Sequence, residues 1–192
     1  MLTGLFQHSL DTGEVPPDWR NAWVVPIFKK GEKHLASNYR PVSLTSVTCK
    51  ILEHIVHSSI MKHYDQYNIL HDSQHGFRRK RSCESQLVIT THEIASSLSQ
   101  CTEVDVILLD FSKAFDKVPH KRLIHKLSYY GVQDKTLTWI ESFLSNRKQE
   151  VLLEGLHSTP APVSGQKSVL LLTFFPYPLS VPKNVIDRFS EK

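Results

Sequence analysis

The segment from Val104 to Phe111 constrains the fold most, because its side chains are almost all apolar. It reads Val-Asp-Val-Ile-Leu-Leu-Asp-Phe, with Asp105 near the start and Asp110 next to the end. Its length and its β-branched residues predict a strand that is buried on both faces. A chain of 192 residues is long enough to bury a core around such a strand. We therefore expect a globular fold with an internal strand.

Composition supports one domain, or one domain and part of another. Hydrophobic residues make up 40% and charged residues 22%, which excludes wholesale disorder. The three cysteines have neither the spacing of a zinc motif nor that of a disulfide framework. From the first residues we expect no secretory signal, and the longest apolar run, residues 169–175, is far shorter than the ~20 residues that span a bilayer. We expect a cytoplasmic or nuclear protein that is not secreted, with no membrane contact and no obvious protein partner.

The first half of the chain predicts helices around a basic hairpin. A helix is expected near residues 2–10, ending before Gly13. Extended segments at 23–28, with Pro26 at an edge, and at 39–42 form the hairpin. A long helix follows, starting near Ser43 or Ser46, and Ser82 would cap another helix. The long helix has one expected apolar face of Leu44, Val47, Ile51 and Ile55, with Leu52 and Val56 beside it.

The second half predicts two helices and a strand. One helix would cover Leu123 to Tyr130 and end at Gly131, and the next would follow a cap at Asp134. Residues 150–153 form a further expected strand. After about residue 155, prolines accumulate and no helical face of useful length appears. We therefore expect an α+β fold, with several helices packed on a small mixed sheet.

Charge is concentrated in three places. The segment from Arg20 to Arg40 carries five Lys or Arg side chains and one acidic side chain. Four consecutive cations follow at Arg78, Arg79, Lys80 and Arg81, whereas residues 103–116 carry four acids and one lysine. Two basic clusters and an acidic one suit a phosphate-rich ligand whose reacting end is held by a cation. Solvated surface charge is the competing interpretation.

Asp110 is the candidate metal ligand. A carboxylate at the end of a buried strand is held by rigid backbone yet faces a cleft, which suits Mg²⁺ and its octahedral coordination. Two such ions stabilise both oxygens in an in-line phosphoryl displacement, and that site needs several carboxylates. The alternative is that Asp110 and Asp116 only cap the following turn.

Four ordered blocks of the chain resemble the reverse transcriptases of non-LTR (LINE-type) retrotransposons. Residues 109–118, Leu-Asp-Phe-Ser-Lys-Ala-Phe-Asp-Lys-Val, resemble the first catalytic motif of that family. Residues 23–31 with 38–44 resemble its fingers motifs. Residues 74–78, Gln-His-Gly-Phe-Arg, and 143–147, Phe-Leu-Ser-Asn-Arg, resemble two further blocks. The resemblance spans about residues 16–155 and rests on the order of the four blocks.

The resemblance implies roles for individual residues. Asp110 would be the catalytic and metal-binding carboxylate, with Mg²⁺, or Mn²⁺ in its place, as the cofactor. Phe111 would lie beside the metal and the triphosphate, and Phe115 would pack under the sugar of the dNTP and exclude a 2′-hydroxyl. Lys29 and Arg40 would contact the triphosphate. The implied partners are an RNA template, a DNA primer and a dNTP, and Arg78, Arg79, Lys80 and Arg81 would lie along the nucleic acid.

The resemblance also implies an architecture, although two sequence motifs of the family are not intact in this chain. The fold would consist of reverse-transcriptase fingers and an incomplete palm, with residues 1–103 as fingers and N-terminal helix, 104–155 as the first part of the palm, and 156–192 as a degenerate, poorly ordered tail. The family pattern continues with Gly-x-Pro-Gln-Gly-Ser and an aromatic-x-Asp-Asp box. Residues 163–170 keep only an eroded version of the first, and no two aspartates are adjacent in the 192 residues.

We therefore expect a reverse-transcriptase domain fragment that is truncated before the Asp-Asp box. It would be inactive in polymerisation on its own. Two alternatives stay open at this point: a nucleic-acid-binding remnant without catalysis, or the product of a decayed element with no molecular function. Histidines 54, 57 and 63 on one expected helix are interpreted as surface residues rather than a zinc site.

Overall fold

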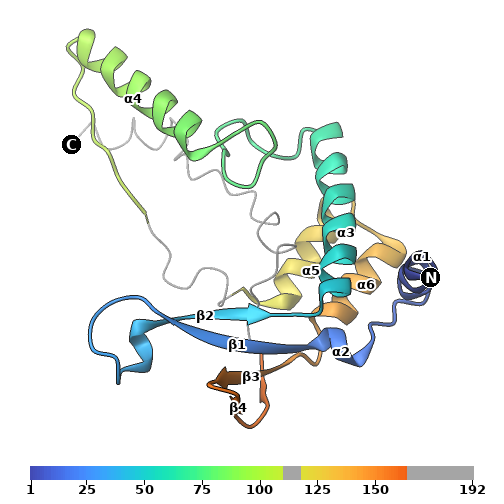
Figure 1. The fold of residues 1–192 in the computed structure, drawn as a ribbon. Coiled ribbons are helices and arrows are strands. Elements are labelled where there is room, and N and C mark those ends of the chain that lie inside the picture. Colours follow the sequence, from blue (N-terminus) through green and yellow to red (C-terminus); the bar gives the residue numbers. More distant parts are fainter. Residues whose placement is uncertain (110–117, 164–192) are drawn as a thin grey trace. The chain divides into compact units, whose positions relative to one another are not determined.

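The computed structural model describes residues 1–109 and 118–163. These residues form two compact units, the first made of residues 1–60 and 118–163, the second of residues 61–109. The first unit holds all the strands of the described chain, and its helices lie beside a small sheet (Figure 1). The expectation of several helices with a small mixed sheet is confirmed at this level.

The sheet of the first unit is built around β1 (Asn21–Phe28). The next strand along the chain, β2 (Tyr39–Leu44), pairs with β1 antiparallel from Trp23 opposite Leu44 to Phe28 opposite Tyr39. β3 (Lys148–Leu153) pairs with β1 in parallel, but only along residues 21–24. The short strands β4 (Leu156–His157) and β5 (Ala161–Pro162) both pair with β3. Pro26 therefore lies beyond the β3 pairing, where its missing N–H breaks no ladder bond on that side.

The N-terminal helices pack on the second of two C-terminal helices. α1 (Leu2–Thr12) ends at Gly13, whose φ of +73° is left-handed, as the sequence predicts for a terminating glycine. The short α2 (Pro17–Arg20) leads into β1. α5 (His120–Tyr129) and α6 (Asp134–Leu144) pack together, and α1 and α2 both contact α6. The prediction of Asp134 as a capping side chain is wrong, because the N-cap position is Gln133 and no side-chain capping bond forms.

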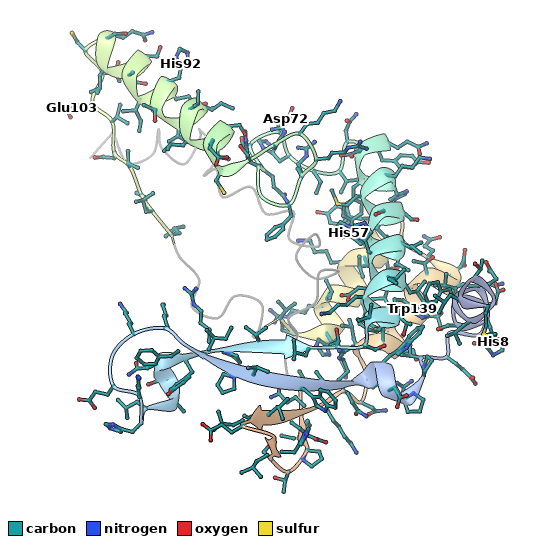
Figure 2. The ribbon with its side chains drawn as sticks, viewed as in Figure 1. His8, His57, Asp72, His92, Glu103 and Trp139 are labelled. Atoms are coloured by element: carbon teal, nitrogen blue, oxygen red, sulfur yellow. The ribbon has the colours of Figure 1, made fainter. Side chains whose placement is uncertain are left out.

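The core of the first unit centres on aromatic residues of α6. Trp139 and Phe143 are fully buried and their rings stack with centroids 5.1 Å apart. Figure 2 shows Trp139 close to α1, and its indole Nε1–H donates to the hydroxyl of Ser9 at 3.0 Å. Ser9 in turn donates to the backbone carbonyl of Glu14. Each buried polar group in this chain of bonds is therefore paired.

The long helix α3 (Val47–Gln66) buries a different face from the one that the sequence predicts. Leu52 and Val56 are buried, together with Cys49, whereas Val47, Ile51 and Ile55 are exposed. The sequence pattern cannot rank these two neighbouring faces, because both are apolar at helical spacing. The face of Val47, Ile51 and Ile55, which the sequence pattern favours as the main contact face, is thus exposed to solvent.

The second unit begins with the end of α3 and contains α4 (Cys83–Ser99). Ser82 caps α4 as the sequence predicts: its hydroxyl accepts from the Ser85 N–H while the Ser85 hydroxyl accepts from the Ser82 N–H, a reciprocal capping box. The expected buried strand is not found in its described part, because residues 104–109 carry no strand and Ile107 and Leu108 are 71% and 90% exposed. A strand is buried on both faces only when neighbouring strands and helices cover it.

Candidate nucleic-acid interface

The β1–β2 hairpin brings Lys29 and Arg40 to one face. Arg40 lies opposite Ile27, and the Lys29 N–H donates to the carbonyl of Asn38 at 2.9 Å, which extends the pairing by one residue. Because side chains alternate along a strand, Lys29 and Ile27 share a face, and directly opposed residues share it too. Lys29 and Arg40 are therefore diagonal neighbours on adjacent strands, and ordinary sheet geometry sets their Cα atoms roughly 7–8 Å apart. Both side chains are exposed, so their cationic groups face solvent together.

The loop between these strands is held by its own side chains. The Asn38 amide donates to the Glu32 carbonyl at 3.0 Å, and the Tyr39 hydroxyl donates to the Lys33 carbonyl at 2.8 Å. A short 3₁₀ turn, η1 (Ala36–Asn38), closes the loop before β2. Gly31 has a φ of +88°, and a Cβ there would come 2.7 Å from the Asn38 amide nitrogen. Glycine thus permits the close turn that follows Lys29.

The four cations at 78–81 divide into two kinds. Arg78 donates to the carbonyl of His71 at 2.9 Å, and its guanidinium lies 3.9 Å from the carboxylates of Asp65 and Asp72. Arg81 donates to both the carbonyl and the carboxylate of Asp72. The side chains of Arg78 and Arg81 are only 16% and 26% exposed. These two arginines tie the loop before α4 to the end of α3 and to the residues that follow it.

Arg79 and Lys80 differ from their neighbours. Both are exposed, and neither forms an ion pair with another residue of the described ranges. Lys80 has a φ of +62°, a left-handed conformation that lies between the two anchored arginines. The loop is therefore fixed at Arg78 and Arg81 while the two central cations face solvent, a distinction that the run of four basic residues does not reveal.

His75 links this loop to the start of α4. It is buried, and its Nδ1 lies 2.6 Å from the hydroxyl of Ser85. That hydroxyl also accepts from the Ser82 N–H and lies 2.9 Å from the Ser82 carbonyl. Because a hydroxyl donates only one hydrogen bond, donation to the Ser82 carbonyl requires His75 to be the donor at Nδ1. The Gln-His-Gly-Phe-Arg block therefore positions the loop through His75.

The sequence-predicted catalytic residues Asp110, Phe111 and Phe115 lie outside the described residues. Within residues 1–109 and 118–163, no group of three or more His, Cys, Asp or Glu side chains is placed to hold a metal ion. His54 and His57 stack on each other, with ring centroids 6.1 Å apart. Burial, and secondarily His54, lowers the pKa of His57.

A buried polar cluster surrounds Arg147, and the sequence-based predictions do not include it. Arg147 is 5% exposed, its guanidinium lies 4.5 Å from the centre of the Phe143 ring, and Glu53 of α3 is equally buried. Burial lowers the pKa of Arg147, while Cys49 and Glu53 act in the opposite direction. Burial, together with Glu53, raises the pKa of the Cys49 thiol to about 12. The spacing of four residues from Trp139 to Phe143 and again to Arg147 is the sequence signal for this stack.

None of the helices in the described ranges is both long and apolar enough to cross a membrane.

Comparison with known proteins places most of the chain in one family. The model of the reverse transcriptase (RNA-dependent DNA polymerase) family matches residues 27–166. A probable RNA-directed DNA polymerase from transposon BS of Drosophila melanogaster is 29% identical over 152 residues, which cover 76% of this chain and 16% of the relative. The RNA-directed DNA polymerase from mobile element jockey of the same species is 28% identical over 178 residues, or 91% of this chain and 19% of the relative.

A third relative comes from another insect. The retrovirus-related Pol polyprotein from type-1 retrotransposable element R2 of Popillia japonica is 30% identical over 135 residues, which cover 70% of this chain and 18% of that protein. The chain thus spans less than a fifth of each of these relatives. Because the family match covers more than half of the chain and these relatives come from mobile elements, the chain belongs to the reverse transcriptase family, in the branch of non-LTR retrotransposons.

Proposed function

We propose that the chain supplies nucleotide and nucleic-acid contacts of a reverse transcriptase without completing the polymerase chemistry by itself. Residues 1–103 would be the fingers with an N-terminal helix, 104–155 the first part of the palm, and 156–192 a degenerate tail. The shared face of Lys29 and Arg40 is the observation that supports the proposal most. Two exposed cations on one face of the hairpin match the oxygens of a dNTP triphosphate, and the arginine fork pairs two of them at once.

Asp110, Phe111 and Phe115 complete the proposed nucleotide site. Reverse transcriptases depend on divalent metal ions as a class, and Asp110 would be this chain's ligand for Mg²⁺ or Mn²⁺. The donor set does not fit a two-ion site, because the chain contains no pair of adjacent aspartates to join Asp110. Mg²⁺ gives up its water ligands reluctantly, and one carboxylate is a weak replacement for them. We therefore assign no metal-dependent step to this chain alone.

Primer extension tests the absence of catalysis. The purified chain is incubated with an RNA template, a DNA primer, dNTPs and either Mg²⁺ or Mn²⁺. We expect no extension above background. Template-dependent extension that disappears in Asp110→Ala would show that the chain is an active polymerase and would overturn this part of the proposal.

Nucleotide binding tests the hairpin site. Equilibrium dialysis with labelled dTTP compares the wild-type chain with Lys29→Gln/Arg40→Gln and with Lys30→Gln, in which a neighbouring cation outside the paired strands is removed. We expect the double variant to lose binding and Lys30→Gln to retain most of it. Equal losses in both would mean that general charge, rather than the shared face, is responsible.

Binding of nucleic acid alone, with neither nucleotide binding nor catalysis, is the second candidate function, favoured by the missing aspartate pair. The exposed cations Arg79 and Lys80 are its proposed phosphate ligands, whereas Arg78 and Arg81 would act by holding the loop. Arg79→Gln/Lys80→Gln should weaken RNA binding and reduce its salt dependence, by about 0.7 in the logarithmic slope for each phosphate of a single strand that is no longer neutralised. Binding that is unchanged in this variant would remove these residues from the interface.

A further inference from the structure

The exposed face of α5 is a third cationic surface, and no motif of the sequence marks it. Around the helix, the residues that face solvent are Lys121, Arg122, His125, Ser128 and Tyr129. Lys121, His125 and Tyr129 are spaced four residues apart, and Arg122 and Ser128 lie beside them on the helix surface. At 100° per residue, the five residues fall within an arc of about 120° around the helix axis. We call this set of five residues the α5 face.

The opposite side of α5 is occupied by the protein itself. Leu123 and Leu127 are 4% and 1% exposed, and α5 packs on α6. An amphipathic basic helix that inserts into a membrane needs a free apolar side. The buried position of Leu123 and Leu127 leaves only the polar face of α5 available to a partner, so a membrane surface does not fit.

Charge on the α5 face has one sign. The ten residues of α5 include three Lys or Arg and two His side chains but no Asp or Glu. Within the described ranges, neither Lys121 nor Arg122 forms an ion pair. This contrasts with Arg78 and Arg81, which are engaged with Asp65 and Asp72. The run of four cations at residues 78–81 is thus partly neutralised by aspartates. The basic residues of α5, by contrast, have no acidic residue within their helix.

An aromatic ring lies within the same arc. Tyr129 is 78% exposed and meets Tyr130 edge to face, with ring centroids 5.2 Å apart. A tyrosine ring flanked by cations is the combination that contacts sugar and base while Lys and Arg hold the phosphates. Lys121 to Tyr129 covers about 12 Å along the helix axis. At about 3.4 Å per nucleotide along one strand, that length matches three to four nucleotides of a duplex.

We propose that the α5 face binds the phosphate backbone of the template–primer duplex, with Lys121 and Arg122 on phosphates and Tyr129 against the sugar edge. This inference rests on the proposed function, since it names a further contact surface for the same nucleic acid. It is distinct from the hairpin site for the nucleotide triphosphate. Binding there is independent of base sequence, because phosphate contacts position a protein without reading bases.

Fluorescence anisotropy with a labelled RNA–DNA heteroduplex tests this inference on the full chain, at several salt concentrations. In Lys121→Gln/Arg122→Gln we expect Kd to rise roughly tenfold or more at 0.1 M salt, and the logarithmic salt slope to fall by about 1.8 for two phosphates. Tyr129→Ala should weaken binding with little change in slope, because it removes no charge.

The matched control is Lys50→Gln/Lys62→Gln, which removes two exposed cations from α3. If this control weakens binding as much as the α5 variant, general charge explains the effect and the inference fails. If the wild-type chain binds the heteroduplex but the α5 variant binds equally well, the α5 inference fails while the proposed function stands. If the wild-type chain does not bind at all, both fail. Far-ultraviolet circular dichroism of each variant confirms that the helices are retained.

Discussion

Trp139 and Ser9 are hydrogen-bonded in the core although 130 positions separate them in the chain, with the indole Nε1–H donating to the Ser9 hydroxyl at 3.0 Å. Ser9 lies in the N-terminal segment that precedes the family match at residue 27. Two further bonds join the N-terminal helices to α6: Lys135 to Asp11 of α1 at 2.7 Å and Arg20 of α2 to Ser142 at 3.2 Å. The N-terminal helices are therefore part of the packed core of the first unit.

Removing the Ser9 hydroxyl should destabilise the first unit. Ser9→Ala leaves the buried Trp139 N–H without its acceptor, and an unsatisfied buried donor costs about 1–3 kcal/mol. Urea unfolding followed by tryptophan fluorescence measures this change. Ser59→Ala is the control, since Ser59 is exposed and only bonds a carbonyl of its own helix. A loss in Ser9→Ala no larger than that in the control would contradict the role of this bond.

Arg147 and Glu53 should be energetically coupled. Glu53 acts electrostatically on the buried Arg147 guanidinium. Arg147→Met therefore removes a favourable interaction of the buried Glu53 carboxylate, at a cost of up to about 3–5 kcal/mol. Glu53→Gln/Arg147→Met should cost less than the sum of the single changes, because the interaction between the two charges is lost only once. A double-mutant cycle of unfolding free energies measures the coupling. Strict additivity would show that the two groups do not interact.

Stability of the first unit should fall on acidification. Burial lowers the pKa of His57 and of His120, with further contributions from His54 and Arg147 respectively. Well above about pH 6.5, the pKa of histidine in the unfolded chain, the two histidines are neutral in both the folded and the unfolded state. Their contribution to the free energy of unfolding is then fully present. As the pH falls below that value the unfolded chain binds protons more readily than the folded one, and the free energy of unfolding decreases.

Urea unfolding at pH 7.5 and pH 5 measures this dependence. His57→Gln/His120→Gln should show a smaller decrease between the two pH values than the wild type. The exposed histidines His8 and His92 supply the control, as His8→Gln/His92→Gln. An equal pH dependence in the wild type and in the His57/His120 variant would exclude these two groups as its source.

Two glycine-to-alanine substitutions should change local stability in opposite directions. Gly31→Ala places a Cβ at a left-handed position and near Asn38, so we expect a loss of about 1–2 kcal/mol in loop stability. Gly4→Ala lies in α1 with no atom within 4 Å of the added Cβ, and should stabilise that helix by up to about 1 kcal/mol. Amide hydrogen exchange of the hairpin loop and of α1 reports each change. Unchanged loop exchange in Gly31→Ala, or faster exchange of α1 in Gly4→Ala, would contradict these expectations.

Local signals in the sequence predicted many of the elements correctly. The glycine after α1, the serine before α4 and the prolines around β1 act through their own backbone conformation or neighbouring N–H groups, so they work in any tertiary context. The β1–β2 hairpin follows from the same local rules, whereas the shared face of Lys29 and Arg40 depends on the register between its two strands. The roles of Asp110, Phe111 and Phe115 stay predictions, since these residues lie outside the described ranges.

Long-range packing decided the rest. The sequence by itself determined the family blocks, the hairpin and the positions of most helices, because these depend on neighbours within a few residues. Only the tertiary structure decided which apolar face of α3 is buried, which arginines of the basic run are held by acids, and that Arg147 is internal. Each of those outcomes depends on a partner outside the local segment, and burial free energy belongs to the pair in contact rather than to either residue alone.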